Sequence, residues 1–304
     1  MLCGFYRNSG PESCVAAVPG GPWESRTRRG GWNSVVGRGT IGALGGHPPL
    51  PFPCGAMMLR CWLVAAFLVF GMAWIPAARG EEAAVAEMPW TELSEYEPRS
   101  IEGWRVVVHP ELVRGEPELC DRTLELLRIQ LYQITRVVPK PAVEKLRKIR
   151  IWVELAHPKH PCMCYHTSPD WLRSNGMNPE KAHGVELSNA RNFLTWTIQQ
   201  PWMVLHELAH GYHDQFLDGG HGNAEVANAY RASQDAKKYA EVLRINGRRE
   251  RHYAATNPME YFAEATEAYF GTNDFYPYVK SELKEHDPAM HELLGKLWNV
   301  TPRN

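Results

Sequence analysis

A five-residue segment, His206-Glu-Leu-Ala-His210, limits what this 304-residue chain can fold into more than any other feature. In an α-helix, two histidines four positions apart lie on the same face, one turn apart. Both rings can then reach one zinc ion at about 2.0–2.1 Å, and Glu207 between them can deprotonate a water bound to that zinc. Burying these three polar side chains without a shared partner would be costly. The segment therefore predicts a buried helix that binds one Zn²⁺ ion.

The residues around this segment predict where the helix begins and ends. Pro201 suits the first helical position, and the residues from Trp202 to Ala209 outside the motif's polar positions are apolar, as in a buried helix. Asp218-Gly-Gly220 should end the helix.

A catalytic zinc site needs a third protein ligand and an open fourth position. His213 lies seven residues from His206, about 10.5 Å of helical rise, so we expect it on the helix surface or beside the ligands, not on the metal. Glu225 is a possible ligand, but its spacing from the motif is unusually short for a ligand on a separate helix.

A second helix offers a better candidate for the third ligand. Asn257 is typical of an N-cap, Pro258 of the first helical position and Gly271 of a helix end. The spacing i, i+4, i+7 places three acidic side chains on one face, at Glu260, Glu264 and Glu267. Two alternatives without a metal stay open. Glu260 could serve only to close a capping box, and Glu264 and Glu267 could form only a solvent-exposed acidic stripe.

The pattern of these two helices resembles a known family over roughly residues 200–271. The HELAH segment, followed by Tyr253-x-x-Thr-Asn257-x-x-Glu260-Tyr-Phe-Ala-Glu264, is similar to zinc peptidases that include the anthrax lethal factor catalytic domain and the Pro-Pro endopeptidases. In that family the first glutamate of the second motif is the third zinc ligand. The tyrosine seven residues before it points at the metal, and the glutamate four residues after it supports the site.

The resemblance implies a role for each matching residue. Glu260 would be the third ligand with His206 and His210, Tyr253 would donate a hydrogen bond to the oxyanion, and Glu264 would accept from a ligand imidazole. The implied activity is that of a zinc metalloendopeptidase, in which Glu207 is the general base for a zinc-activated water. The chain is too short to hold a toxin's targeting domains, so the lethal factor substrate does not carry over.

The first 80 residues differ from the rest of the chain. Residues 1–56 belong to a glycine-rich stretch without a periodic apolar pattern, and we expect them to be disordered or a mis-assigned upstream segment. Residues 57–80 contain a basic start, about 15 apolar residues and a small-residue end, which is typical of a secretory signal peptide. Residues 81–304 are then expected to form a single zincin-like catalytic domain that is secreted or periplasmic.

Charge and hydropathy exclude two classes of partner. Seven of the 33 basic residues and two of the 34 acidic residues lie in residues 1–80, so the remainder is acidic and has no basic stripe for nucleic acid. The apolar run of the signal peptide is short for a membrane span, and no stable span is expected after its cleavage. The expected partner is a peptide or protein substrate bound in extended form.

Three cysteines fall in the expected domain. In an oxidising compartment, the simplest arrangement is one disulfide from Cys120 to either Cys162 or Cys164, with one thiol left over. The loop 157–166 is rich in histidine and cysteine, so a second metal site there is an open alternative.

The coarse layout indicates an α+β fold, with a small mixed sheet packed by helices and a mostly helical C-terminal half. The expected strands are 104–109, 149–155 and 183–187, and the expected helices are 116–137, 143–148 (a short helix or turn), 190–198, the two motif helices, 224–243 and 289–298. By analogy with zincins, we expect Val185–Ser188 to be the edge that pairs with substrate.

Two alternatives to a peptidase remain open on these residues. One is a zinc hydrolase that acts on non-peptide amides, and the other is a secreted metal-binding protein with a vestigial site. Glu207 and Tyr253 argue against a vestigial site, because a purely structural metal needs neither.

Overall fold

The computed structural model describes residues 90–157 and 160–300 of the chain. The expected upstream segment and signal peptide, residues 1–56 and 57–80, lie outside the described residues. Within the described part of the chain, no helix combines the length and the hydropathy needed to cross a bilayer.

Five short strands form one mixed sheet in the order β1-β2-β3-β5-β4. They are β1 (Glu97–Ile101), β2 (Trp104–Val108), β3 (Ile151–Val153), β4 (Met163–Tyr165) and β5 (Val185–Leu187). The pairs β2–β3 and β3–β5 are parallel, whereas β1–β2 and β4–β5 are antiparallel.

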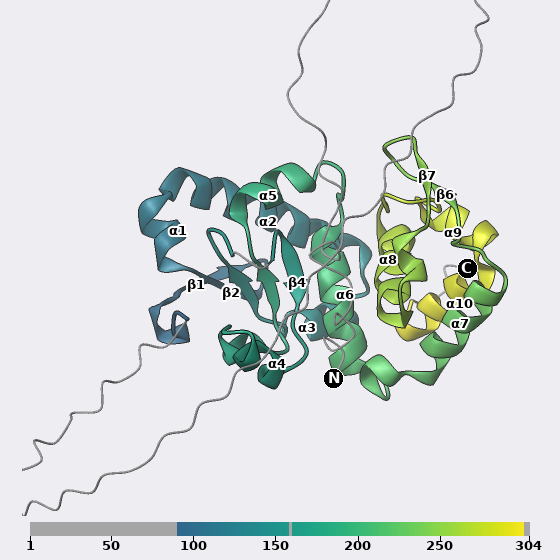
Figure 1. Ribbon diagram of the computed structural model, residues 1–304, viewed down its shortest axis with the longest axis horizontal. Coiled ribbons are helices and arrows are strands. Elements are labelled where there is room, and N and C mark those ends of the chain that lie inside the picture. Colours follow the sequence, from purple (N-terminus) through teal and green to yellow (C-terminus); the bar gives the residue numbers. More distant parts are fainter. Residues whose placement is uncertain (1–89, 158–159, 301–304) are drawn as a thin grey trace, which may run out of the picture. The chain divides into compact units, whose positions relative to one another are not determined.

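Helices lie between the later strands and follow the sheet along the chain (Figure 1). The first half contains α1 (Pro110–Gly115), α2 (Pro117–Val137), α3 (Lys140–Leu146), α4 (Pro169–Ser174) and α5 (Ala190–Trp196). The second half contains α6 (Met203–Phe216), α7 (Ala224–Asp235), α8 (Pro258–Phe270), α9 (Lys280–His286) and α10 (Pro288–Leu297), with a two-stranded ribbon of β6 (Val242–Leu243) and β7 (Arg249–Glu250). The expected α+β class, with a mostly helical C-terminal half, is confirmed.

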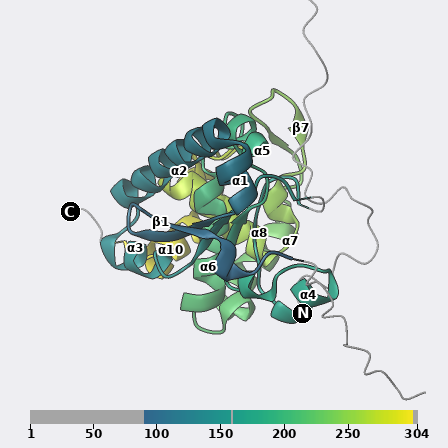
Figure 2. The same cartoon turned by 90° about the vertical axis from the view of Figure 1, so that its left-hand side faces the viewer.

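The sheet has two different faces because side chains alternate along each strand. Val106 and Val108 point into the main core, which also takes the apolar stripe of α2. Val107 and Trp152 point the other way and pack with Tyr96 in a separate small cluster. The 21-residue helix α2 packs against α1, α5 and α6 (Figure 2), so the helices that carry the main core lie on the Val106 face.

Helix α6 packs against both β4 and α8 (Figure 1). Its apolar residues are buried on nearly every side, as expected for a helix between two layers. Gly211 permits the close approach to the sheet, because a Cβ there would lie 2.6 Å from Ile149 Cδ1 and 3.0 Å from Tyr165 Cε2. This packing brings the HELAH segment next to the second motif helix.

The structure corrects three expectations about the elements. Helix α6 begins at Met203, because Pro201 and Trp202 form a turn before it. Helix α7 ends at Asp235 instead of continuing to Leu243, and Lys237 soon after it takes a left-handed conformation with φ 52°.

The third correction concerns the edge of the sheet. Strand β5 pairs with β3 on one side and β4 on the other, so Val185–Ser188 is not an edge. Among the described strands, β4 takes that position.

Candidate metal centre

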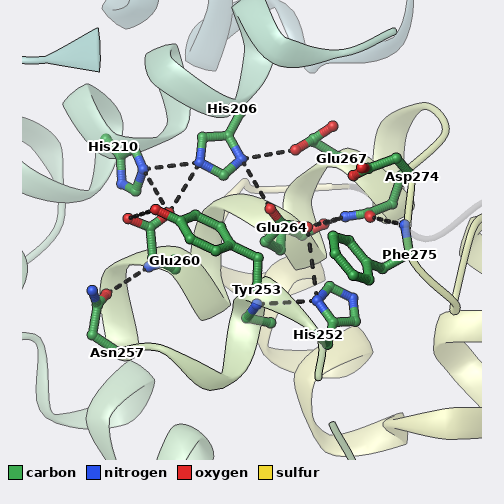
Figure 3. A network of polar contacts seen from close by, with 12 residues as sticks. His206, His210, His252, Tyr253, Asn257, Glu260, Glu264, Glu267, Asp274 and Phe275 are labelled. Carbon is green, nitrogen blue, oxygen red and sulfur yellow. Dashed lines mark hydrogen bonds and ion pairs between the residues drawn. The ribbon is translucent and has the colours of Figure 1, made fainter. Parts of the chain in front are cut away.

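Helix α8 begins where the sequence predicted. The side chain of Asn257 caps the helix by accepting a hydrogen bond from the backbone N–H of Glu260 at 2.8 Å, and Pro258 occupies the first turn. The cap fixes the first turn of α8, and Glu260 faces α6 from that turn (Figure 3).

Three donor atoms from the two helices converge on one point (Figure 3). His206 Nε2 lies 3.1 Å from His210 Nε2 and 3.1 Å from Glu260 Oε2, and His210 Nε2 lies 3.3 Å from the same carboxylate oxygen. The two histidines are each only 9 % exposed. Sequence positions 54 residues apart thus form one cluster of the kind that can hold a metal ion.

The separations fit a tetrahedral zinc ion. Two donors at about 2.0–2.1 Å from such an ion lie about 3.3 Å apart, close to the three distances observed. A direct contact between two ring nitrogens is also a poor hydrogen bond unless one ring is protonated on that atom. The donor set of two imidazoles and one carboxylate leaves a fourth position for water or substrate.

Electrostatics keep Glu260 in the state that a metal needs. Burial alone would raise its pKa, but His210 and His206 hold the pKa of this carboxyl well below its ordinary value. His206 responds in the opposite sense, because hydrogen bonds with Glu260 and Glu267 outweigh burial and raise its pKa well above the ordinary value. The cluster therefore holds a carboxylate and a proton that a metal ion would displace.

The other nitrogen of His206 is held by Glu267. Glu267 Oε1 lies 2.7 Å from His206 Nδ1, whereas Glu264 Oε1 lies 3.7 Å away. We expected Glu264 to accept from a ligand imidazole; in the structure, Glu267 makes the short contact. Glu264 is instead bound by Asn273, whose Nδ2 donates to its carboxylate at 2.7 Å and to its backbone carbonyl at 2.8 Å.

Tyr253 lies at the exposed side of the cluster, within the 3-10 turn Tyr253–Ala255. Its hydroxyl is 3.4 Å from Glu260 Oε1, and its ring centroid is 6.4 Å from that of His206 (Figure 3). His252 positions this turn, because its Nδ1 accepts from the backbone N–H of Ala254 at 3.0 Å. Burial lowers the pKa of His252 to about 3, so the ring is neutral and able to accept.

Glu207 lies between the two histidines on α6 and is half-buried. The middle of α6 is contacted by His221, whose Nε2 lies 3.2 Å from the backbone carbonyl oxygen of His210. His221 itself follows α6 in a short 3-10 turn.

Two residues weighed as ligands lie elsewhere. His213 is fully buried rather than on the helix surface, and its ring packs 4.9 Å from Phe262 and 5.0 Å from His221. Glu225 is at the start of α7, where it forms an ion pair with Lys296. Neither belongs to the donor cluster.

The predicted disulfide is wrong for the described part of the chain, where no disulfide joins Cys120, Cys162 and Cys164. Cys162 instead packs against Met203, with 3.5 Å between the two sulfur atoms. Cys164 lies beside His166 on β4. Cys162 and Cys164 therefore contact different parts of the protein.

Sequence reasoning placed Glu267 on the correct helix face but gave it no role, and it missed Asn273 and His221. The i, i+7 spacing from Glu260 was a usable signal for Glu267. Asn273 follows the helix end in an irregular segment, so only the folded chain brings it to Glu264.

No protein-family model matches this chain, and neither does any curated protein. Among solved structures, the chain is similar to the Pro-Pro endopeptidase PPEP-2 from Paenibacillus alvei, with 19 % identity and a TM-score of 0.38 over 66 % of this chain and 99 % of that one. A likeness at this score carries no functional weight, and the proposal that follows rests on the donor cluster and the motifs.

Proposed function

We propose that this protein is a secreted zinc-dependent metalloendopeptidase of the zincin type. The observation that carries the proposal is the convergence of His206 Nε2, His210 Nε2 and Glu260 Oε2 at separations of 3.1–3.3 Å. Two imidazoles and one carboxylate with a fourth position left open are a donor set that catalytic zinc sites use.

Zinc held there would act as a Lewis acid on the scissile carbonyl and on the attacking water. Glu207, on the same helix as both histidines, would accept a proton from that water and pass it to the leaving amine. Tyr253, at the exposed side of the cluster, would donate a hydrogen bond to the developing oxyanion. Glu267 would keep the ring of His206 oriented through its Nδ1.

The substrate would bind as an extended strand. In the described sheet, β4 is an edge strand and packs against α6, the helix that carries Glu207. A peptide that pairs with β4 would therefore run past the donor cluster, with its backbone held by main-chain hydrogen bonds. The proposed substrate-binding strand is therefore β4 and not β5.

The first experiment measures zinc per chain and cleavage of a peptide library by the purified protein. Stoichiometric zinc with peptide cleavage supports the proposal. Zinc without cleavage of any peptide would favour the two alternatives, a vestigial metal-binding protein or a hydrolase of non-peptide amides. A panel of non-peptide amide substrates then separates those two.

The matched control is Glu207→Gln, which keeps the shape of the side chain but removes the base. It should retain zinc and lose about 10²–10⁴-fold in kcat, the range typical of general-base catalysis. Unchanged turnover by a zinc-loaded Glu207→Gln protein would contradict the mechanism.

Localisation is tested separately. Secretion predicts that protein recovered outside the cytoplasm begins near residue 81, after the segment 57–80 is removed. Recovery of peptides from residues 1–50 in the mature protein would contradict this part of the proposal.

A further inference from the structure

A second group of metal-ligand side chains lies on the face of the sheet opposite α6. Cys164 of β4 is the cross-strand partner of Glu186 of β5, and both point away from the face formed by Val185 and Leu187. His166, just after β4, completes the group, with its Nε2 at 2.6 Å from Glu186 Oε2 and 3.5 Å from Cys164 Sγ. Cys164 is half-buried, while His166 and Glu186 are buried.

The way the three side chains meet distinguishes a metal site from a catalytic relay. In a nucleophile–base–acid relay, the histidine uses one ring nitrogen for the nucleophile and the other for the acid. Here the thiol and the carboxylate approach the same nitrogen of His166. Three donor atoms that meet at one point in this way are arranged as the ligands of a single ion are.

The separations can be compared with those around zinc. A thiolate sulfur at about 2.3 Å and an imidazole nitrogen at about 2.0–2.1 Å from a tetrahedral zinc lie about 3.5 Å apart, which matches Cys164 and His166. The contact between His166 and Glu186 is shorter and would have to open from 2.6 Å to about 3.3 Å. Metal binding would therefore have to break the hydrogen bond between His166 and Glu186.

His160 supplies an independent sign of a missing partner. Both of its ring nitrogens are shielded from solvent and have no hydrogen-bond partner among the residues that the structure describes, although such buried groups normally have one. Its ring is 5.7 Å from that of His166, in a T-shaped arrangement.

The charges behind the group also leave room for a cation. Lys181 Nζ bridges Glu154 and Glu186 at 2.7 Å each, and all three side chains are almost fully buried. With His166 neutral, as a metal ligand must be, the two carboxylates and one ammonium leave one net negative charge in a site where uncompensated charge is costly. A dication together with the thiolate of Cys164 would bring this sum to zero.

We propose that Cys164, His166 and Glu186 form a second site, which binds a thiolate-seeking divalent ion of the zinc type, and that the neighbouring ring of His160 turns to become the fourth donor. Four protein donors would close the coordination shell, so the ion would be structural rather than catalytic. It would fasten the edge strand β4 to β5 and to the loop that carries His160. The site does not depend on the activity proposed for the His206 cluster.

Cobalt(II) substitution tests the site in the full-length protein without an activity assay. A thiolate ligand gives cobalt a near-ultraviolet charge-transfer band, which the cysteine-free His206 cluster cannot produce. We expect the band in the parent protein, its loss in Cys164→Ser, and its retention in the matched control Cys162→Ser. Cys162 suits this control because its sulfur packs against Met203. Far-ultraviolet circular dichroism reports whether each variant is folded.

The unmodified chain offers a second measurement that no folding defect can obscure. Zinc loading should slow alkylation of Cys164 at least tenfold, as followed by peptide mass spectrometry. The proposal would be overturned if the parent protein shows no charge-transfer band. It would also be overturned if the band survives Cys164→Ser, or if Cys162→Ser loses it equally. So would an alkylation rate at Cys164 that zinc leaves unchanged, since His166 and Glu186 would then form only a hydrogen bond.

Discussion

At the scale of single residues, the two nitrogens of His206 have different tasks. Nε2 faces Glu260 and His210, whereas Nδ1 faces Glu267 at 2.7 Å and Glu264 at 3.7 Å. An acceptor on Nδ1 fixes the tautomer and the orientation of a metal-binding ring, and its loss typically costs 10–100-fold in metal affinity or activity. We therefore expect Glu267→Gln to weaken zinc binding about 10–100-fold. Glu264→Gln, the matched control one turn away, should weaken it less, and a larger effect of Glu264→Gln in a competition titration would reverse these assignments.

At the scale of elements, the cap of α8 should couple helix stability to metal binding. Asn257 accepts from the backbone N–H of Glu260 at 2.8 Å, and Asn223 caps α7 in the same way through Val226 at 3.0 Å. Each substitution by alanine should lower the free energy of unfolding by about 1 kcal/mol. Only Asn257→Ala should also weaken zinc binding, because only this cap positions a proposed metal ligand, Glu260. Thermal unfolding and zinc titration of both variants test this, and equal zinc affinity in the two would show that the cap is purely structural.

The elements also show how far the sequence could predict the fold and the site. The limits of α8 were predictable because an N-cap, a proline and a terminal glycine are local signals. Strand β4 was not, because three residues among prolines and cysteines have no periodicity, and only pairing with β5 makes them a strand. The end of α7 was missed because its polar pattern continues past the point where Lys237 turns the chain. Glu260 was found through its motif, whereas the contact of Glu267 with His206 depends on how α6 packs against α8.

At the scale of the whole molecule, metal binding should be linked to pH. In the metal-free protein, hydrogen bonds with Glu260 and Glu267 raise the pKa of His206 well above its ordinary value, against the effect of burial. The ring is then protonated at neutral pH, and because zinc requires the neutral ring, binding should release about one proton from it. Zinc affinity should therefore fall as the pH drops below this raised pKa. Calorimetry in buffers of different ionisation enthalpy measures the released protons, and their absence at pH 7 would contradict the linkage.

We propose that the packing of the whole domain brings Glu260 to the two histidines of α6 as a third metal ligand. Zinc per chain after dialysis against a graded series of chelator concentrations tests it most directly, on the parent, Glu260→Gln and Glu225→Gln proteins. Glu225 is the matched control, since it makes an exposed ion pair with Lys296 away from the cluster. We predict that Glu260→Gln loses zinc at chelator concentrations that leave the other two proteins loaded, because a neutral amide replaces an anionic oxygen on a dication. Equal zinc retention by Glu260→Gln and the parent would contradict the claim.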